Sequence, residues 1–134
     1  MPSPTETPAS FYAGLRYEDA DAGIAWLESV LGAERHELFR DDAGKVVHGE
    51  LIFGGAILML SSAGIGREPF RSLPAGQQLI YCAIEDPDAL HERAVAAGAE
   101  VAFGLTDTDY GSRDFTLRDP EGNLWSFGTY RPTA

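Results

Sequence analysis

The sequence has little of what holds a small protein together covalently or anchors it in a membrane. Its 134 residues include one cysteine, Cys82, which excludes an internal disulfide framework. Because Cys82 lies in an apolar run, we expect a small buried side chain rather than a nucleophile. No apolar run approaches the roughly 20 residues of a transmembrane helix. A chain of this length can bury roughly two thirds of its unfolded surface, so one domain without disulfides or structural metals is expected.

Basic residues are also scarce. Lys and Arg number 10 against 21 Asp and Glu, which gives a formal net charge of −11, and the acidic residues are spread along the chain. This balance disfavours a nucleic-acid partner and is compatible with cationic small ligands or with plain solubility. The first ten residues lack the basic and then apolar pattern of a secretory signal, so we expect a cytoplasmic protein with no membrane partner.

The sequence does contain a weak internal repeat. An acidic pair, a further Asp-Ala and an apolar-periodic run that closes on Gly-Ala-Glu occur twice, beginning at Glu18 and Glu85 and ending at Glu34 and Glu100. The offset between the two copies stays constant to within one residue across a whole helix. Such a repeat favours a duplicated unit, with a binding site built between the copies.

Each copy has the pattern of a strand, a helix and three further strands. Asp19 and Asp86 are suited to cap the two helices, and Gly32 to end the first. The expected strands cover residues 11–17, 34–40, 46–53, 56–61, 79–84, 101–106, 113–118 and 124–130. The predicted fold class is therefore α+β, with two βαβββ modules in tandem.

The modules are expected to form a single domain over residues 11–131. Module 1 covers residues 11–61, module 2 covers residues 79–131, and residues 1–10 are expected to be a disordered tail. The segment between the modules, residues 62–78, contains Gly, Pro and Ser at intervals and is typical of a linker or of a flap over a site. Its Arg67 and Arg71 either close over an anionic ligand or are solvated.

Two features of the sequence are typical of a known superfamily. One is this order of elements, and the other is the closing segment from Asp114 to Phe127, DFTLRDPEGNLWSF. The chain resembles the vicinal oxygen chelate superfamily, which includes glyoxalase I, the bleomycin-resistance proteins and the extradiol dioxygenases. The likeness covers about residues 11–131. It implies that each module forms half of a cup-like barrel, that two halves close around a cavity, and that the protein is a homodimer.

The resemblance also implies where a metal would be held. Metal-dependent members place a His on the first strand of a module and a carboxylate on its last, since such ligands on rigid strands leave an open coordination position for substrate. In this chain the His positions fall on Tyr12 and Leu79, and the carboxylate positions fall on Met59 and Ser126. None of the four is an ordinary ligand of a divalent metal, so we predict neither a metal nor another cofactor.

Alternation along the strands predicts which side chains face the cup, because a shift of one residue would exchange the two faces of a strand. The predicted ligand-binding residues are Tyr12, His48, Glu50, Met59, Leu79, Tyr81, Asp114 and Ser126. Further cup positions are Gly14, Arg16, Ile52, Ile57, Ala83, Thr116, Leu124 and Gly128, whereas Phe11, Leu15, Tyr17, Phe115, Trp125 and Phe127 are expected in the core. An aromatic and apolar cup with few polar groups is typical of a small-molecule site.

The carboxylates of Glu50 and Asp114 would favour a cationic ligand. Because an unpaired buried carboxylate is costly, each must be solvated, be paired with Arg16 or Arg113, or await a ligand.

His48 is the candidate for chemistry, since it is expected to face the cup one strand step from Glu50, which would orient it as a general base. No second histidine is expected beside it, and the alternative is an ordinary surface histidine. A metal site of His48, Glu50 and Asp114 is also conceivable on ligand type.

Three functions follow from these alternatives. The preferred one is a metal-independent protein that binds an aromatic or cationic natural product, like the antibiotic-resistance branch. The second is a lyase or isomerase of the glyoxalase type, which uses a noncanonical metal set or His48 as base. The third is a regulatory module without a specific ligand.

Overall fold

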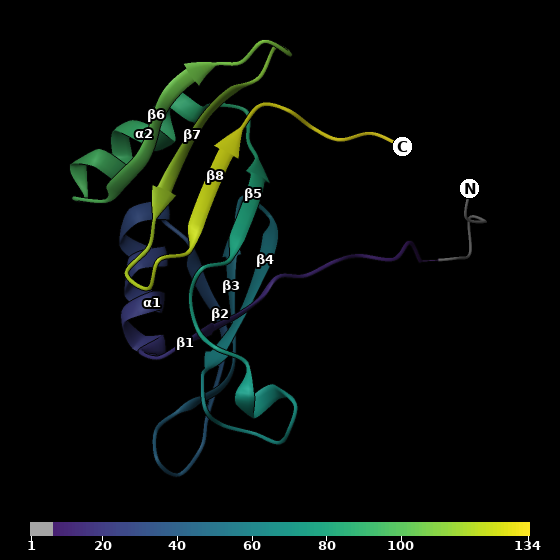
Figure 1. Cartoon of the computed structure of the whole chain (residues 1–134), viewed down its shortest axis with the longest axis vertical. Helices are drawn as coiled ribbons and strands as arrows, with labels where there is room; N and C mark the ends of the chain where they lie inside the picture. The colour runs from purple at the N-terminus through teal and green to yellow at the C-terminus, as the bar shows by residue number, and fades with distance from the viewer. Residues whose placement is uncertain (1–6) are drawn as a thin grey trace.

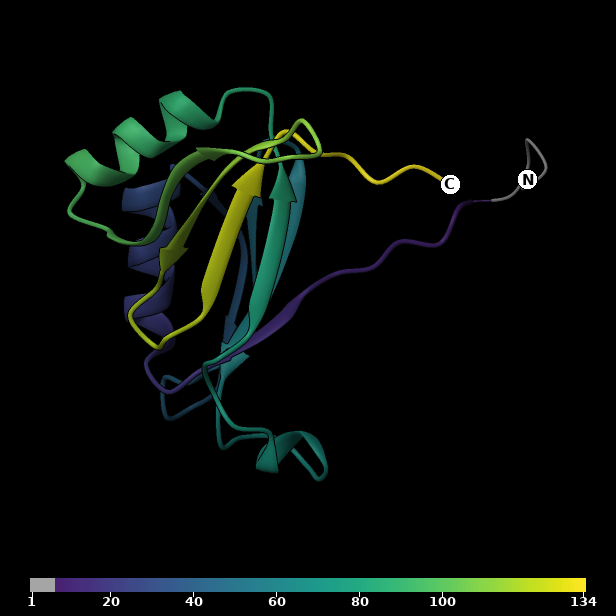
Figure 2. The same ribbon diagram turned by 45° about the horizontal axis from the view of Figure 1, so that its top comes forward.

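Two four-stranded sheets, each with a helix that follows its first strand, make up the fold (Figure 1). The computed structural model describes residues 7–134, so most of the predicted disordered tail, residues 1–6, lies outside the described residues. Residues 7–13 have no regular secondary structure and run away from the body, as Figures 1 and 2 show.

The predicted α+β fold with two βαβββ modules in tandem is confirmed. Module 1 contains β1 (Gly14–Tyr17), α1 (Ala20–Trp26), a π-helical turn (Leu27–Leu31), β2 (Glu34–Arg40), β3 (Val46–Phe53) and β4 (Ala56–Ser62). Module 2 contains β5 (Leu79–Ala83), α2 (Pro87–Ala96), β6 (Glu100–Asp107), β7 (Arg113–Arg118) and β8 (Leu124–Gly128). The strand orders are β1-β4-β3-β2 and β5-β8-β7-β6, and in each sheet the first strand of the module lies parallel to its last.

Both helices begin at the residues that the sequence predicts. The Asp19 carboxylate accepts a 3.0 Å hydrogen bond from the backbone N–H of Ala22, and Asp86 accepts one of the same length from Ala89. Each bond satisfies a backbone donor that has no partner within the helix. Gly32 ends the π-helical turn with a φ of 73°, a conformation that glycine adopts without strain.

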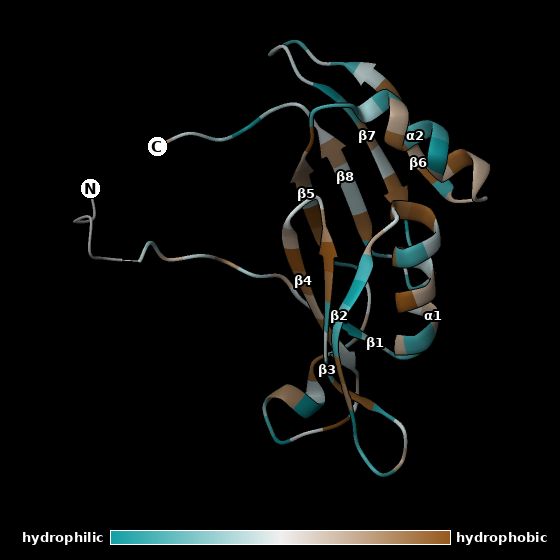
Figure 3. Ribbon diagram, turned by 180° about the vertical axis from the view of Figure 1, so that it is seen from behind, coloured by the Kyte–Doolittle hydropathy of each residue, from teal (hydrophilic) through white to brown (hydrophobic). Residues whose placement is uncertain are grey.

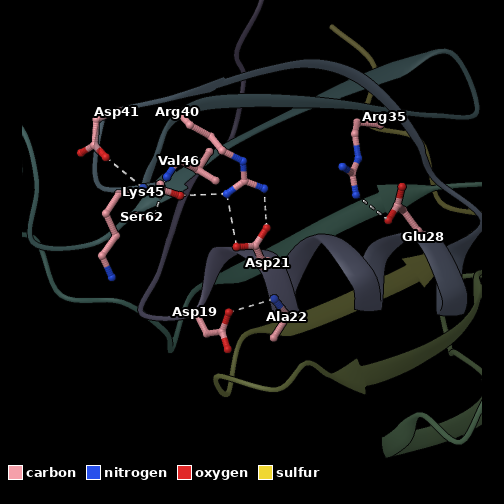
Figure 4. A network of polar contacts seen from close by, with 11 residues as sticks. Asp19, Asp21, Ala22, Glu28, Arg35, Arg40, Asp41, Lys45, Val46 and Ser62 are labelled. Carbon is pink, nitrogen blue, oxygen red and sulfur yellow. Dashed lines mark hydrogen bonds and ion pairs between the residues drawn. The ribbon is translucent and has the colours of Figure 1, made fainter.

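Polar contacts fix the β2–β3 hairpin against α1 (Figure 4). Arg40 lies 2.6 Å from the Asp21 carboxylate of α1 and also donates a 2.9 Å hydrogen bond to the carbonyl of Gly44 in the hairpin turn. The Ser62 hydroxyl accepts a 2.9 Å bond from the backbone N–H of Val46, which ties the end of β4 to the start of β3. Because the Arg40–Asp21 pair is exposed to solvent, it orients the hairpin rather than supplying the stability of the module.

The two modules share one hydrophobic core. Trp26, the last residue of α1, packs on Trp125 of β8 with ring centroids 5.8 Å apart, and Phe53 of β3 packs on Phe127 of β8 at 6.1 Å. The largest fully buried side chains come from both modules: Trp125, Tyr17, Phe115, Phe127, Ile24, Leu27, Leu51 and Leu117. Figure 3 shows the apolar character of β4 and β5 and the polar character of β2, whose residues are almost all exposed.

The turn between β7 and β8 contains two buried polar residues, Asp119 and Asn123. Asp119, 4% exposed, accepts hydrogen bonds from Asn123 Nδ2 at 2.9 Å and from Trp125 Nε1 at 3.1 Å. Glu121 in the same turn reaches across to module 1, where its carboxylate accepts from the backbone N–H groups of Glu18 at 2.7 Å and Asp19 at 2.9 Å. A carboxylate from module 2 therefore binds the start of the helix of module 1.

Two predictions about the ends of strands are wrong. The first strand begins at Gly14 rather than at residue 11, and Phe11, predicted to be in the core, is 104% exposed. The last strand ends at Gly128 rather than at residue 130. β1 pairs with β4 only from Gly14 onward, although β4 itself begins at Ala56, and β8 pairs with β5 only as far as Gly128. None of the helices in residues 7–134 has the length and apolar character that crossing a bilayer requires.

Candidate functional site

The predicted cup residues of module 1 line two neighbouring cavities on one face of its sheet. A cavity of about 310 Å³ is lined by Arg16, His48 and Met59 and is flanked by Phe70 and Leu73 of the linker. A second cavity of about 250 Å³ is lined by Tyr12, Glu50, Ile57 and Met59. The linker thus borders this face, as expected of a flap, although it does so with apolar side chains.

Arg16 is not the partner of Glu50. Its guanidinium donates to the Ser61 hydroxyl at 3.3 Å and to the carbonyl of Ile65 at 3.1 Å. The Nε atom is buried and has no hydrogen-bond partner among the described residues. The structure therefore uses Arg16 to hold the start of the linker against β1 and β4.

Glu50 contacts histidines instead. His48 Nε2 lies 2.7 Å from Glu50 Oε2, and His36 Nε2 lies 4.0 Å from Glu50 Oε1. The side chains of His48 and Glu50 are 39% and 24% exposed. The carboxylate can therefore orient His48, but the expectation that no second histidine lies nearby is wrong. The sequence pattern could not show this contact, because the β2–β3 pairing is irregular between Arg35 and Glu37 and His36 lies in that irregularity.

The predicted cup residues of module 2 lie on the outer face of the second sheet. Leu79 is 71% exposed and Tyr81 is 39% exposed. The hydroxyls of Thr116 and Ser126 are 2.7 Å apart, so Ser126 already has a protein partner. Asp114 accepts a hydrogen bond from the Ser112 hydroxyl and a 3.3 Å bond from the hydroxyl of Tyr110. Alternation within strands could not find Ser112 and Tyr110, because they lie in the loop before β7.

Arg113 does not pair with Asp114. Its guanidinium lies 2.7 Å from Asp88 and 3.1 Å from Asp107, and these two contacts raise the pKa of Arg113 above its ordinary value. Side chains of adjacent residues on a strand point to opposite faces, which separates the Arg113 guanidinium from the Asp114 carboxylate.

The two cavities on the cup face of module 1 are lined by residues of module 1 and the linker. The opposite sides of both sheets pack into the shared core, so the predicted cup faces point away from it and stay open to solvent. Closure of two half-cups around a cavity, as the family resemblance implies, stays a prediction. A groove of about 220 Å³ spans the modules. Core-side residues such as Phe53, Leu58 and Phe127 line it together with Ile57 and Tyr81 from the predicted cup faces.

The residues present do not fit a divalent metal at the positions that the family resemblance implies. Tyr12, Met59, Leu79 and Ser126 offer a phenol, a thioether, a hydrocarbon and a hydroxyl, none of which is a good ligand for Zn²⁺, Ni²⁺ or Fe²⁺ in this combination. Within residues 7–134 no three His, Cys, Asp or Glu side chains are placed to hold a metal ion. His48 and Glu50 lie on β3, whereas Asp114 lies on β7 of the other sheet, and the described residues do not bring the three together as a metal-binding group.

Known structures with this architecture include proteins of several activities. TioX from Micromonospora sp. ML1 is 30% identical, with a TM-score of 0.75 over 92% of this chain and 100% of that one. Lactoylglutathione lyase from Agrobacterium tumefaciens has a TM-score of 0.68 over 92% of this chain and 95% of that one, and at 22% identity it shows the fold alone.

Sequence relatives extend the comparison. An uncharacterized protein of Mycobacterium tuberculosis is 34% identical over 91 aligned residues, and the match covers 63% of this chain and 53% of that protein. The chain thus spans about half the length of this curated relative. The sequence model of the glyoxalase, bleomycin resistance protein and dioxygenase superfamily matches residues 10–127. The chain belongs to the Glyoxalase/Bleomycin resistance protein/Dioxygenase superfamily.

Proposed function

We propose that this protein binds aromatic or cationic natural products, antibiotics among them, without a metal, as the bleomycin-resistance branch of its superfamily does. The observation that carries the proposal is the chemistry of Tyr12, Met59, Leu79 and Ser126, which stand where metal ligands would be expected and do not fit a metal. Protection by sequestration needs affinity and no catalytic group.

The composition of the faces supports a ligand of this kind. Tyr12 and Tyr81 offer aromatic rings for stacking, and Met59, which borders two cavities, offers a side chain that adapts to irregular shapes. Glu50 and Asp114 supply one carboxylate on each face. Apolar surface with a few polar groups is the usual composition of small-molecule sites.

A homodimer belongs to the same proposal. Each chain leaves its two cup faces open, and a second copy would supply the opposite wall of each cup. The extended residues 7–13, in which Phe11 is fully exposed, run away from the body (Figure 2), and in a dimer the second copy would cover them. Light scattering after size exclusion is expected to give twice the mass of 14.5 kDa, and a monomer at micromolar concentration would contradict this part of the proposal.

The test is calorimetry of the full chain against a panel of intercalating and glycopeptide antibiotics. At least one compound is expected to bind saturably, with a Kd on the order of micromolar. Tyr12→Ala is expected to weaken that binding, whereas Val95→Ala, at an exposed position on α2, should leave it unchanged. Absence of binding across the whole panel would overturn the proposal.

A second candidate is an isomerase or lyase in which His48 is the base. The 2.7 Å contact between His48 and Glu50 favours it, because a carboxylate that orients an imidazole can support proton abstraction next to a carbonyl. Formation of lactoylglutathione from glutathione and methylglyoxal is a suitable assay, run with and without added Ni²⁺ or Zn²⁺. Activity that His48→Gln abolishes and His91→Gln retains would replace the binding proposal with this one.

A further inference from the structure

Three tyrosines and one carboxylate lie together at the end of the outer face of module 2. Tyr81 comes from β5, Tyr110 from the loop before β7, and Tyr130 from the segment after β8, while the carboxylate is that of Asp114 on β7. We call these four residues the tyrosine cluster. Only Tyr81 and Asp114 are among the ligand-binding residues that strand alternation predicts.

Hydrogen bonds and ring contacts hold the tyrosine cluster together. The Tyr110 hydroxyl donates to Asp114 Oδ2 at 3.3 Å, and the Tyr81 hydroxyl donates to the backbone carbonyl of Tyr130 at 2.6 Å. The rings of Tyr110 and Tyr130 meet edge to face, with centroids 5.8 Å apart and planes at 85°. Ser112 joins the two sides, since its hydroxyl donates to Asp114 and accepts from the backbone N–H of Tyr130 at 3.1 Å.

The Asp114 carboxylate gives this site a negative charge. In the described part of the chain, no cationic side chain is paired with it. Asp114 receives hydrogen bonds from the neutral hydroxyls of Ser112 and Tyr110, and no Lys, Arg or His nitrogen of residues 7–134 forms an ion pair with it. Its neighbour Arg113 is bound to two other carboxylates. A half-buried carboxylate without a cation is stabilised by any ammonium group that reaches it.

The rings leave room for such a group. Tyr110, Tyr130 and Tyr81 are 68%, 49% and 39% exposed, so parts of all three rings remain open to a ligand. The face of a phenol ring attracts a cation, and the phenol oxygens can also accept hydrogen bonds from an ammonium group.

A glycine on β8 leaves space for two side chains of the tyrosine cluster. Gly128 lies opposite Asp114 in the β7–β8 pairing. A Cβ at position 128 would overlap the Asp114 carboxylate and lie 2.9 Å from the Tyr81 hydroxyl. Because Gly128 has no side chain, the carboxylate and the phenol can both lie against the strand.

We propose that the tyrosine cluster binds the ammonium group of an aromatic amine, with Asp114 as the charge partner and the rings of Tyr81, Tyr110 and Tyr130 around the cation. The proposal rests on the proposed function, because it names the part of the ligand that the module 2 face selects. The apolar side chain of Leu79, next to Tyr81 on the same face, would contact the aromatic part of the ligand.

The experiment compares 2-phenylethylammonium with the neutral 2-phenylethanol in NMR titrations of the full chain at neutral pH. The ammonium compound is expected to bind about fivefold more tightly, with the largest amide shifts at Tyr81, Ser112 and Asp114. Asp114→Asn should remove this preference without changing the affinity for 2-phenylethanol. Asp109→Asn removes the same charge from an exposed loop position and should preserve the preference.

Each outcome has one meaning. Equal affinities of the two compounds in the natural protein, or a preference that survives in Asp114→Asn, would overturn the ammonium site and leave the binding function standing if the antibiotic panel is positive. Shifts confined to module 1 would also overturn the ammonium site. If Asp114→Asn unfolds, Tyr110→Leu serves instead, and it should lower the ammonium preference without affecting urea unfolding.

Discussion

The hydroxyl of Tyr17 donates a 2.8 Å hydrogen bond to Asp119 Oδ2 across 102 residues of sequence. Tyr17 is fully buried at the end of β1 in module 1, and Asp119 is buried in the β7–β8 turn of module 2. The same carboxylate oxygen also accepts from Asn123 and Trp125. This bond therefore joins the first strand of one module to the last turn of the other.

Tyr17→Phe is expected to lower the free energy of unfolding by about 1–2 kcal/mol, because the buried Asp119 carboxylate loses a donor that water cannot replace. Urea denaturation gives the value. Tyr110→Phe is the matched control, since it also removes a hydroxyl bonded to an aspartate but at a position that is 68% exposed. The control should change stability by less than about 0.5 kcal/mol, and equal losses in the two variants would contradict the prediction.

Stability should fall at alkaline pH in a way that depends on Tyr17. Burial, reinforced by the Asp119 carboxylate, raises the pKa of Tyr17 well above its ordinary value of 10.0. Above about pH 10 the unfolded chain releases this proton while the folded chain keeps it, so unfolding is favoured by up to about 1.4 kcal/mol per pH unit. Below that pH the contribution is fully present and constant.

The measurement is the difference in unfolding free energy between the natural protein and Tyr17→Phe, followed from about pH 8 to about pH 11. Tyr81 and Cys82, whose pKa values burial also raises, are present in both proteins, so their effects cancel. The difference should be constant up to about pH 9.5 and shrink above it. A constant difference over the whole range would show that Tyr17 ionises equally in both states.

Cys82 should react slowly with thiol reagents in the folded protein. It is half-buried on β5, and burial raises the pKa of its thiol, which lowers the fraction of reactive thiolate. We expect Ellman's reagent at about pH 8 to modify the folded chain at least tenfold more slowly than the chain unfolded in urea. Similar rates in the two states would place the thiol in contact with solvent.

Gly128→Ala should damage the tyrosine cluster while leaving the backbone of β8 intact. Its methyl group would displace the Asp114 carboxylate from its place beside Tyr81, with an expected loss of about 1–3 kcal/mol of stability. The affinity for 2-phenylethylammonium should fall by about fivefold, as expected for loss of the charge contact. Gly104→Ala on β6 is the control, because no atom lies within 4 Å of the added methyl group. If the control weakens binding equally, the effect does not arise from the overlap with Asp114.

The sequence correctly predicted those elements that depend on residues close together in the chain. The caps at Asp19 and Asp86 and the hairpin between residues 34–40 and 46–53 depend on residues a few positions apart, and the structure contains them as predicted. Strand alternation also placed Tyr17, Phe115, Trp125 and Phe127 in the core correctly, since one buried face forces a period of two.

What the sequence could not predict depends on contacts between distant segments. Phe11 continues the alternation of β1, yet it is exposed, because alternation does not say where a neighbouring strand stops pairing. His36 reaches Glu50 only through the irregular β2–β3 pairing, and Tyr110 and Tyr130 join the cluster from loops that have no period. The direction in which the two cup faces point follows from the shared core, a property of the assembled modules that neither repeat contains by itself.

The contact of Glu121 with the first residues of α1 has a consequence for the history of the duplication. A half chain cut in the linker would lose this cap from module 1 and would expose Trp125 and Phe127 of module 2 to water. Neither repeat is then an autonomous folding unit, although the pattern of each is still visible in the sequence. Once the copies had come to depend on each other for a helix start and a core, they could diverge in their outer faces but could no longer be inherited apart.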